Sequence, residues 1–239
     1  MSIAIIFAGG TGQRMNTRTR PKQFLELHGK PIIIYTLEQF DQHEMIDGII
    51  IVCVEGWLDY CQELIHRFRI NKVKAIVPGG KTGMISRFNG VKKAVELYPE
   101  DTICLMHDGV RPLIDYETIK RNIECAQKFG SAITVAPAVE TIAVKDINNQ
   151  VGMIMDRSLC QMAKAPQSFR LGELLKAHQR AVDEGMEDCI DTAYLMQKNG
   201  HLLYTVVCSP ENIKITTPTD FYIFRALIDA KENSQIFGI

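Results

Sequence analysis

The amino-acid sequence predicts an α/β protein with a Rossmann-like, doubly wound and mostly parallel sheet. Two observations predict this class: short apolar runs alternate with segments of helical spacing, and a glycine-rich loop directly follows the first run. The size agrees, because 239 residues with 46% hydrophobic and 23% charged side chains are typical of one large globular domain. We therefore expect residues 1–239 to form a single domain.

Apolar and β-branched runs predict strands at residues 3–8, 48–54, 74–77, 102–106 and 132–136. Helical spacing between these runs predicts helices at residues 31–42, 57–68, 86–97 and 116–128. The last third of the chain adds helices at residues 171–182 and 191–198 and a strand at residues 202–207.

A final helix is predicted to begin at Thr217-Pro218-Thr219-Asp220, which supplies a capping hydroxyl, a proline at the first helical position and an acid in the first turn. We expect its apolar face to consist of Ile223, Phe224, Leu227 and Ile228.

A hairpin pattern interrupts the alternation at about residues 139–160. β-Like residues at 141–144 are followed by a polar turn at 145–150 and a second apolar run at 151–155. A two-stranded ribbon is marginally stable unless its apolar face packs against another surface. That surface can belong to the same domain or to a second subunit, and the pattern leaves both open.

The charge balance gives no reason to expect a nucleic acid or a membrane as partner, since 27 Lys and Arg stand against 28 Asp and Glu. The seven cysteines are scattered and never spaced Cys-x-x-Cys, which argues against a disulfide framework or a zinc site and favours the cytoplasm. The first apolar run ends at Gly9-Gly10, so we expect neither a signal peptide nor a membrane span.

The loop after the first strand reads Ala8-Gly9-Gly10-Thr11-Gly12-Gln13-Arg14-Met15. Glycines let backbone N–H groups form an anion-binding nest, so this loop can hold a triphosphate. The dinucleotide fingerprint would need glycine where Met15 stands, and Gly80-Lys81-Thr82 lacks the first glycine of a Walker A loop, at Ala75. A dehydrogenase and a P-loop hydrolase are therefore both disfavoured.

Four cations, Arg14, Arg18, Arg20 and Lys22, follow within a dozen residues of the glycines. A charge run alone is usually a solvated face. Beside an anion nest, however, such cations can neutralise the charge that develops when one phosphate displaces another.

Asp108 and Arg111 follow the fourth strand in His107-Asp108-Gly109-Val110-Arg111-Pro112. Because ligands of open α/β sheets bind at the carboxyl ends of strands, both should face the same crevice as the glycine loop. Asp108 would suit magnesium and Arg111 a phosphate. The plain alternative is an ion pair that closes the turn.

The sequence resembles the polyol-phosphate cytidylyltransferases, a group that contains the 2-C-methyl-D-erythritol 4-phosphate and the ribitol 5-phosphate enzymes. The resemblance runs nearly end to end and rests on five ordered motifs: the loop from Ala8 to Met15, Pro21-Lys22-Gln23, His107-Asp108-x-x-Arg111-Pro112, Ala165-Pro166-Gln167-x-Phe169 and Asn212-Ile213-Lys214-Ile215-Thr216. It implies a nucleotidyltransferase fold with a protruding β-arm, and a reaction of CTP with a polyol phosphate that yields a CDP-polyol and pyrophosphate.

The resemblance also implies roles for individual residues. Arg14, Lys22 and Lys214 would stabilise the reacting phosphates, and Asp108 would carry Mg²⁺. CTP would be bound by Ala8, Gly9, Gly10, Gly12, Gly80 and Ser86. The polyol phosphate would be bound by Arg111 and, from an arm that reaches into the partner of a homodimer, by Thr141 and Arg157.

The residues favour D-ribitol 5-phosphate as the acceptor, with 2-C-methyl-D-erythritol 4-phosphate as the alternative. The stretches Lys22 to Leu27 and Lys214 to Thr217 look more like the ribitol branch, and Ala165 stands where many members have threonine. Lys81, Thr82 and Gly83 also depart from the family pattern. A non-catalytic nucleotide-binding protein of the same fold is the alternative from another class, because a fold alone does not certify activity.

Overall fold

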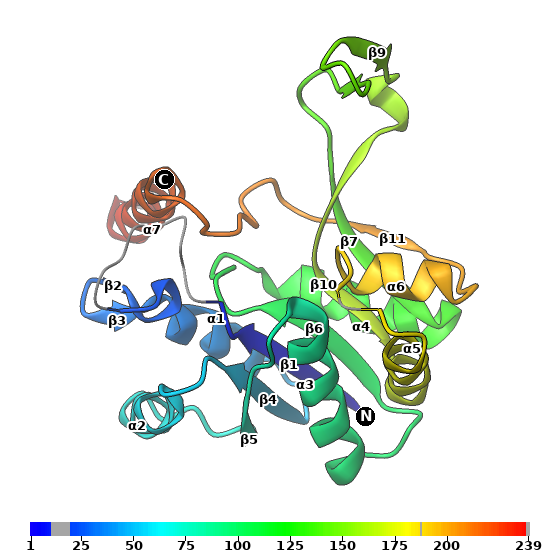
Figure 1. Cartoon of the computed structure of the whole chain (residues 1–239). Coiled ribbons are helices and arrows are strands. Elements are labelled where there is room, and N and C mark those ends of the chain that lie inside the picture. Colours follow the sequence, from blue (N-terminus) through cyan, green and yellow to red (C-terminus); the bar gives the residue numbers. More distant parts are fainter. Residues whose placement is uncertain (11–19, 187, 238–239) are drawn as a thin grey trace.

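The computed structural model describes residues 1–10, 20–186 and 188–237, and it is built around a seven-stranded sheet (Figure 1). The strands lie in the order β11-β7-β10-β6-β1-β4-β5. Their bounds are β1 Ser2–Ala8, β4 Gly48–Cys53, β5 Val73–Pro78, β6 Ile103–Asp108, β7 Ser131–Pro137, β10 Gln161–Arg170 and β11 Thr205–Val207. All neighbours are parallel except β10, which runs antiparallel between β6 and β7.

Helices cover both faces of the sheet, as the doubly wound pattern predicts. One face packs against α1 (Ile32–Asp41), α2 (Leu58–Arg67) and α4 (Tyr116–Phe129), and the other against α3 (Gly83–Leu97), α5 (Leu171–Asp183) and α6 (Thr192–Lys198). Side chains of β1 alternate between the two cores: Ala4 and Ile6 belong to the first, Ile3 and Ile5 to the second. This period-two alternation with apolar residues on both faces is why the parallel strands read as continuous apolar runs.

The predicted helices and five parallel strands are confirmed, with differences at some ends. Helix α3 begins at Gly83, three residues before the predicted start, because the Thr82 side chain caps it by accepting a hydrogen bond from the Ile85 N–H. The C-terminal strand begins only at Thr205, where it joins β7.

Strand β10 was not predicted. Pro166 lies within it, and proline cannot donate to a strand ladder, so the sequence does not read as a central strand. The structure accommodates the proline with a register shift against β7 between Ala163 and Gln167.

The final helix, α7 (Pro218–Phe237), begins where the capping signal predicts, but its apolar face is rotated. Phe224 is fully buried and Leu227 and Ile228 are partly buried, whereas the prediction was wrong for Ile223, which is 45% exposed. Phe221 packs in its place, because positions 221, 224 and 228 share one side of a helix and position 223 does not. None of the described helices is both long and apolar enough to cross a membrane.

The predicted hairpin forms and projects from the body of the molecule (Figure 1). Its strands β8 (Ala143–Lys145) and β9 (Val151–Ile154) pair with each other, and every residue in them is exposed. A short 3₁₀ turn, η3 (Arg157–Leu159), leads from this arm into β10. The ribbon therefore does not fold back onto its own body, and its apolar side chains remain uncovered.

Helix α3 packs closely on the sheet at Gly90. A Cβ atom at this position would lie 2.7 Å from Ile5 Cγ2 and 2.8 Å from Val52 Cγ2. Alanine is the better helix former by about 1 kcal/mol, yet overpacking a core costs about 1–3 kcal/mol. Both contacts are shorter than 3.0 Å, so the cost should lie in the upper part of that range, and we expect Gly90→Ala to lower the free energy of unfolding by about 1–2 kcal/mol in urea denaturation.

Gly152→Ala is the matched control, because a Cβ atom there meets its nearest neighbour at an ordinary 3.5 Å. A Gly90→Ala protein as stable as the wild type would contradict this account of the helix–sheet contact.

Candidate active site

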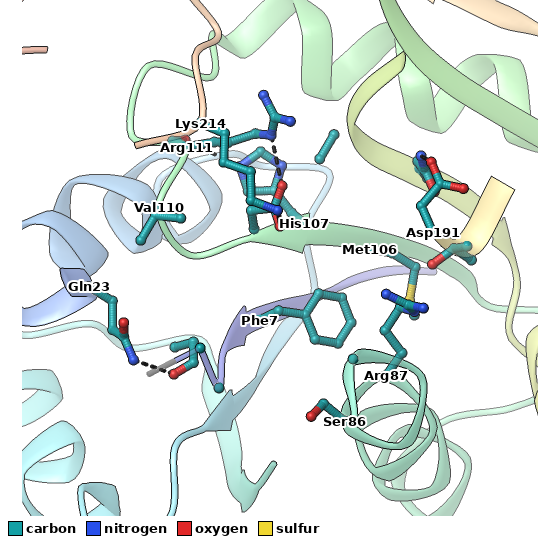
Figure 2. Close-up of a pocket in the computed structure, with 18 of the residues that line it drawn as sticks. Phe7, Gln23, Ser86, Arg87, Met106, His107, Val110, Arg111, Asp191 and Lys214 are labelled. Carbon is teal, nitrogen blue, oxygen red and sulfur yellow. Dashed lines mark hydrogen bonds and ion pairs between the residues drawn. The ribbon is translucent and has the colours of Figure 1, made fainter. Parts of the chain in front are cut away.

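A cavity of about 610 Å³ opens at the carboxyl ends of β1 and β6 (Figure 2). The sheet register explains its position: Phe7 pairs with Asp108, so the glycine loop and the Asp108 loop leave the sheet side by side. The two segments approach each other closely there, because the Gly109 N–H donates a hydrogen bond to the Phe7 carbonyl at 2.8 Å. The start of α3, strand β10 and the start of α6 complete the walls, and the volume suits a small-molecule site.

Most of the predicted site residues meet in this cavity. Its lining includes Ala8, Gly9, Gly10, Lys22, Gly80, Ser86, Asp108, Arg111 and Lys214. Gly12 and Arg14 lie outside the described residues. Thr141 and Arg157 belong to the arm and do not line the cavity of their own chain; Arg157 instead donates to the Val139 carbonyl at 3.1 Å.

The cavity concentrates positive charge in a protein whose net charge is -1. Its described lining carries six cations, Lys22, Lys81, Arg87, Arg111, Lys164 and Lys214, against two acids, Asp108 and Asp191. Cations crowded into one partly enclosed space repel one another unless anions enter. The lining is therefore suited to a ligand with several negative charges.

Asp108 lies at the centre of the cation cluster. Its Oδ2 accepts a hydrogen bond from Arg111 Nε at 2.8 Å, and its Oδ1 accepts one from Lys214 Nζ at 2.7 Å. Burial raises the pKa of this carboxyl, but the charges and hydrogen bonds of Lys214 and Arg111 outweigh it and hold the pKa well below the usual range. The Asp-x-x-Arg pair thus forms the ion pair considered as the plain alternative, and the same two side chains also face the cavity.

Lys22 is held at the rim by its neighbours in the 3₁₀ turn η2 (Lys22–Phe24). Gln23 is buried and donates through Nε2 to the Ala8 carbonyl at 2.5 Å, which ties the turn to the end of β1. Phe24 is fully buried and stacks on Trp57, with 5.2 Å between the centroids of the two rings. These two anchors place Lys22 next to the glycine loop.

The loop before α3 brings backbone close to the cavity. The Gly80 N–H donates to Ser86 Oγ at 2.9 Å, and the same hydroxyl donates to the Thr82 carbonyl at 2.9 Å. A Cβ atom on Gly80 would lie 2.2 Å from Ile85 Cγ2, so only glycine fits this turn. Lys81, Thr82 and Gly83, which depart from the family pattern, nevertheless line the cavity.

The sequence reasoning did not select Lys164, although it lies next to the Ala165-Pro166-Gln167 motif. Lys164 Nζ donates to the carbonyls of Pro210 at 2.9 Å and Asn212 at 3.2 Å, and Arg111 Nη1 donates to the same Asn212 carbonyl at 3.0 Å. These bonds fix the segment that carries Lys214. Burial lowers the pKa of Lys164, and nearby Arg111 lowers it further.

Gln167 and Asp191 form a second polar group that was not selected. Gln167 Nε2 donates to Asp191 Oδ2 at 2.8 Å, and Gln167 Oε1 accepts from the Ala193 N–H at 2.8 Å. Asp191 also caps α6 through the Tyr194 N–H. Gln167 belongs to the Ala165-Pro166-Gln167 motif, whereas only the fold brings Asp191 next to it.

Asp108 gives a pH-dependent prediction. A depressed pKa in the folded state stabilises the protein above the unfolded carboxyl pKa of about 3.9, and this stabilisation is lost as the pH falls through the folded value. We expect Asp108→Asn to lower the free energy of unfolding by about 1–3 kcal/mol at pH 7. The difference from wild type should shrink as the pH is lowered below about 4.

Urea denaturation between pH 3 and pH 8 measures this difference, with Asp101→Asn, an exposed site with no side-chain bond shown, as the control. A wild-type advantage that is unchanged at low pH would show that the ion pairs with Arg111 and Lys214 are not its source.

Comparison with known proteins gives a family. The sequence model described as "IspD: 2-C-methyl-D-erythritol 4-phosphate cytidylyltransferase" matches residues 2–230. The ribitol-5-phosphate cytidylyltransferase of Vibrio parahaemolyticus is 51% identical over 238 residues, and that of Streptococcus agalactiae is 48% identical over 239, with 100% of each chain covered. The 2-C-methyl-D-erythritol 4-phosphate cytidylyltransferase of Clostridium acetobutylicum is 38% identical and covers 98% of this chain and 99% of its own.

Solved structures agree with this match. The 4-diphosphocytidyl-2C-methyl-D-erythritol synthase of Anaerococcus prevotii superposes with a TM-score of 0.83 at 25% identity, covering 96% of both chains. The IspD structure from Francisella tularensis gives a TM-score of 0.76 at 26% identity, covering 93% of this chain and 98% of that one. The chain therefore belongs to the IspD family of cytidylyltransferases.

Proposed function

We propose that the protein transfers the cytidylyl group of CTP to D-ribitol 5-phosphate, with release of pyrophosphate and formation of CDP-ribitol. The observation that carries this proposal is the convergence of cations from separate chain segments on one cavity beside a glycine loop. Such a site suits the joining of two phosphorylated molecules, because both carry negative charge. The ribitol-5-phosphate relatives, at 48–51% identity, support ribitol over methylerythritol, whose relatives reach 38%.

In the proposed reaction an oxygen of the acceptor phosphate attacks the α-phosphorus of CTP. The new P–O bond forms as the bond to the β-phosphate oxygen breaks, and the electron pair leaves with pyrophosphate. No covalent enzyme intermediate is needed. Lys22 and Lys214, which line the cavity, and Arg14 would stabilise the charge that develops on the α-phosphate. Lys214 would exchange its bond to Asp108 for one to phosphate.

CTP would occupy the side of the cavity formed by the glycine loop and by the segment that runs from Gly80 to Ser86. The backbone of Gly9, Gly10 and Gly12 would approach the triphosphate, while Ala8, Gly80 and Ser86 would line the base and ribose. The fit at Gly80, where a Cβ atom would lie 2.2 Å from Ile85, supports a role in keeping this wall close to the ligand.

Mg²⁺ would be held by Asp108 together with phosphate oxygens of CTP. Asp108 fits this ion, since magnesium in nucleotide sites is commonly bound by one or two carboxylates plus phosphates. The other acid of the described lining, Asp191, accepts hydrogen bonds from Gln167 and from the Tyr194 N–H. When bound, Mg²⁺ would neutralise phosphate charge. Both oxygens of Asp108 accept hydrogen bonds from cations, and these bonds orient the carboxylate toward the cavity.

The arm would complete the site of a second copy of the chain. All residues of β8 and β9 are exposed, and the large apolar side chains Val144, Val151, Met153 and Ile154 are among them. Burying them in a homodimer would supply the surface that an isolated ribbon needs. Thr141 and Arg157 would then reach the acceptor phosphate in the partner's cavity, opposite Arg111. The chain would be one domain, residues 1–239, with the arm as an insertion at about 139–160.

The cytoplasm is the compartment we propose, because all seven cysteines are free thiols, as a reducing compartment maintains them. A protein that binds nucleotides without catalysis would need only part of the cation cluster. The presence of Lys22, Arg111 and Lys214 in one cavity therefore favours the enzyme.

Pyrophosphate release tests the function. With Mg²⁺ and CTP we expect turnover of ribitol 5-phosphate and little or none of 2-C-methyl-D-erythritol 4-phosphate. Removal of the metal with EDTA should abolish the turnover of ribitol 5-phosphate.

Lys22→Ala should lower kcat about 100- to 1,000-fold while the protein stays folded, because the charge of Lys22 is needed in the transition state. Lys176→Ala, on an exposed face of α5, is the control. Absence of turnover with either acceptor would favour the non-catalytic alternative, and near-normal Lys22→Ala would refute the role of Lys22.

A mixed dimer tests the arm. Lys22→Ala and Arg157→Ala, each inactive or weak alone, are co-expressed with different tags and the heterodimer is purified. If the arm acts in the partner's site, one of its two sites has both residues intact, and about half of the wild-type activity should return. If each arm serves its own chain, both sites of the heterodimer are defective. A heterodimer whose activity is not restored would therefore contradict the proposal that the arm acts in the partner's site.

A further inference from the structure

Arg87 is a cation of the cavity that the roles above do not use. It lies in the second turn of α3, one residue after Ser86, and its side chain lines the cavity. Nη2 donates to the carbonyl and to the sulfur of Cys189, each at 2.9 Å. Nε is buried and has no hydrogen-bond partner among the described residues.

Within the ranges 1–10, 20–186 and 188–237, Arg87 forms no ion pair. Among the described residues no carboxylate lies within ion-pair distance of this guanidinium, whereas Arg111 and Lys214 share Asp108. A half-buried guanidinium presents five N–H donors, and leaving such donors without acceptors is unfavourable. The missing acceptors are therefore expected to arrive with a ligand.

The position of Arg87 in the cavity indicates which part of the ligand would supply these acceptors. Figure 2 shows Gln23, beside the glycine loop, and Arg87 on opposite sides of Phe7. The wall near Arg87 is completed by Asp191 from the start of α6 and by Gln167 from β10, the strand that leads out of the arm. In the proposed reaction the acceptor phosphate lies beside Lys22 and Lys214, and this wall is the part of the described lining that is left for its carbon chain.

We propose that the guanidinium of Arg87 binds hydroxyl groups of the polyol chain and so selects the acceptor. This inference rests on the proposed function and adds a specificity residue to it. A hydroxyl oxygen accepts from the arginine, while its proton can be donated to a carboxylate such as Asp191, so the wall offers both partners that a polyol needs. A site that hydrogen-bonds hydroxyls also disfavours acceptors that lack them, because its polar groups would be left unpaired.

Calorimetric titration of CDP and of CDP-ribitol separates the polyol from the nucleotide. We expect the wild type to bind CDP-ribitol more tightly than CDP. Arg87→Met should weaken CDP-ribitol binding about 10- to 100-fold, the range for a hydrogen bond to a charged group, and leave CDP binding within about twofold. In turnover, KM for ribitol 5-phosphate should rise in parallel while KM for CTP stays constant.

Two further variants serve as controls for the effect of Arg87→Met. Arg121→Met, on an exposed face of α4, is the matched control and should behave as wild type. Arg87→Lys keeps the charge but loses the planar fork, and it should weaken CDP-ribitol several-fold at an unchanged melting temperature.

Equal weakening of CDP and CDP-ribitol would assign Arg87 to the nucleotide, and no change in either would leave it only the contact with Cys189; both results overturn the proposal. Wild-type protein that fails to turn over ribitol 5-phosphate would refute the proposed function, whereas normal wild-type turnover with an unaffected Arg87→Met would refute this inference alone.

Discussion

Asp108 accepts hydrogen bonds from two cations that belong to distant parts of the sequence, Arg111 in its own loop and Lys214 near the C-terminus. This three-residue cluster is the constraint on which the site depends. The carboxylate offsets part of the repulsion between cations that the cavity brings together, and it binds the Lys214 segment to the end of β6. Because its position follows from the pairing of Phe7 with Asp108, the sheet register and the charge cluster form one unit.

Buried amide side chains hold the walls of the cavity together. Gln23 bonds the Ala8 carbonyl, Asn212 bonds the Ala165 carbonyl, and Gln167 joins Asp191 to the Ala193 N–H. An amide offers both donors and an acceptor without carrying charge, so it can join backbone segments in the interior. Gln167 uses both ends of its amide, whereas the buried Asn212 Oδ1 has no partner among the described residues. The amides therefore help to fix the segments that carry the charged side chains of the cavity.

The body of the molecule and the arm differ in how they are stabilised. The body packs an apolar core against each face of the sheet. The arm has no core of its own, since β8 and β9 expose every residue. A segment of this kind gains stability through contact with another surface, which is consistent with the proposal that the arm belongs functionally to a neighbouring chain.

The sequence alone predicts the α/β class, the order of the main helices and parallel strands, the hairpin, and nine of the residues that line the cavity. These features are local: buried parallel strands read as apolar runs, helices show their period and caps, and glycines and cations mark the phosphate loop. The three-dimensional fold adds that β10 inserts antiparallel between β6 and β7, that α7 turns Phe221 rather than Ile223 inward, and that Lys164, Arg87 and Asp191 line the cavity. Those outcomes depend on which segments become neighbours, and pairings between residues far apart in the chain leave no periodic signal in either segment alone.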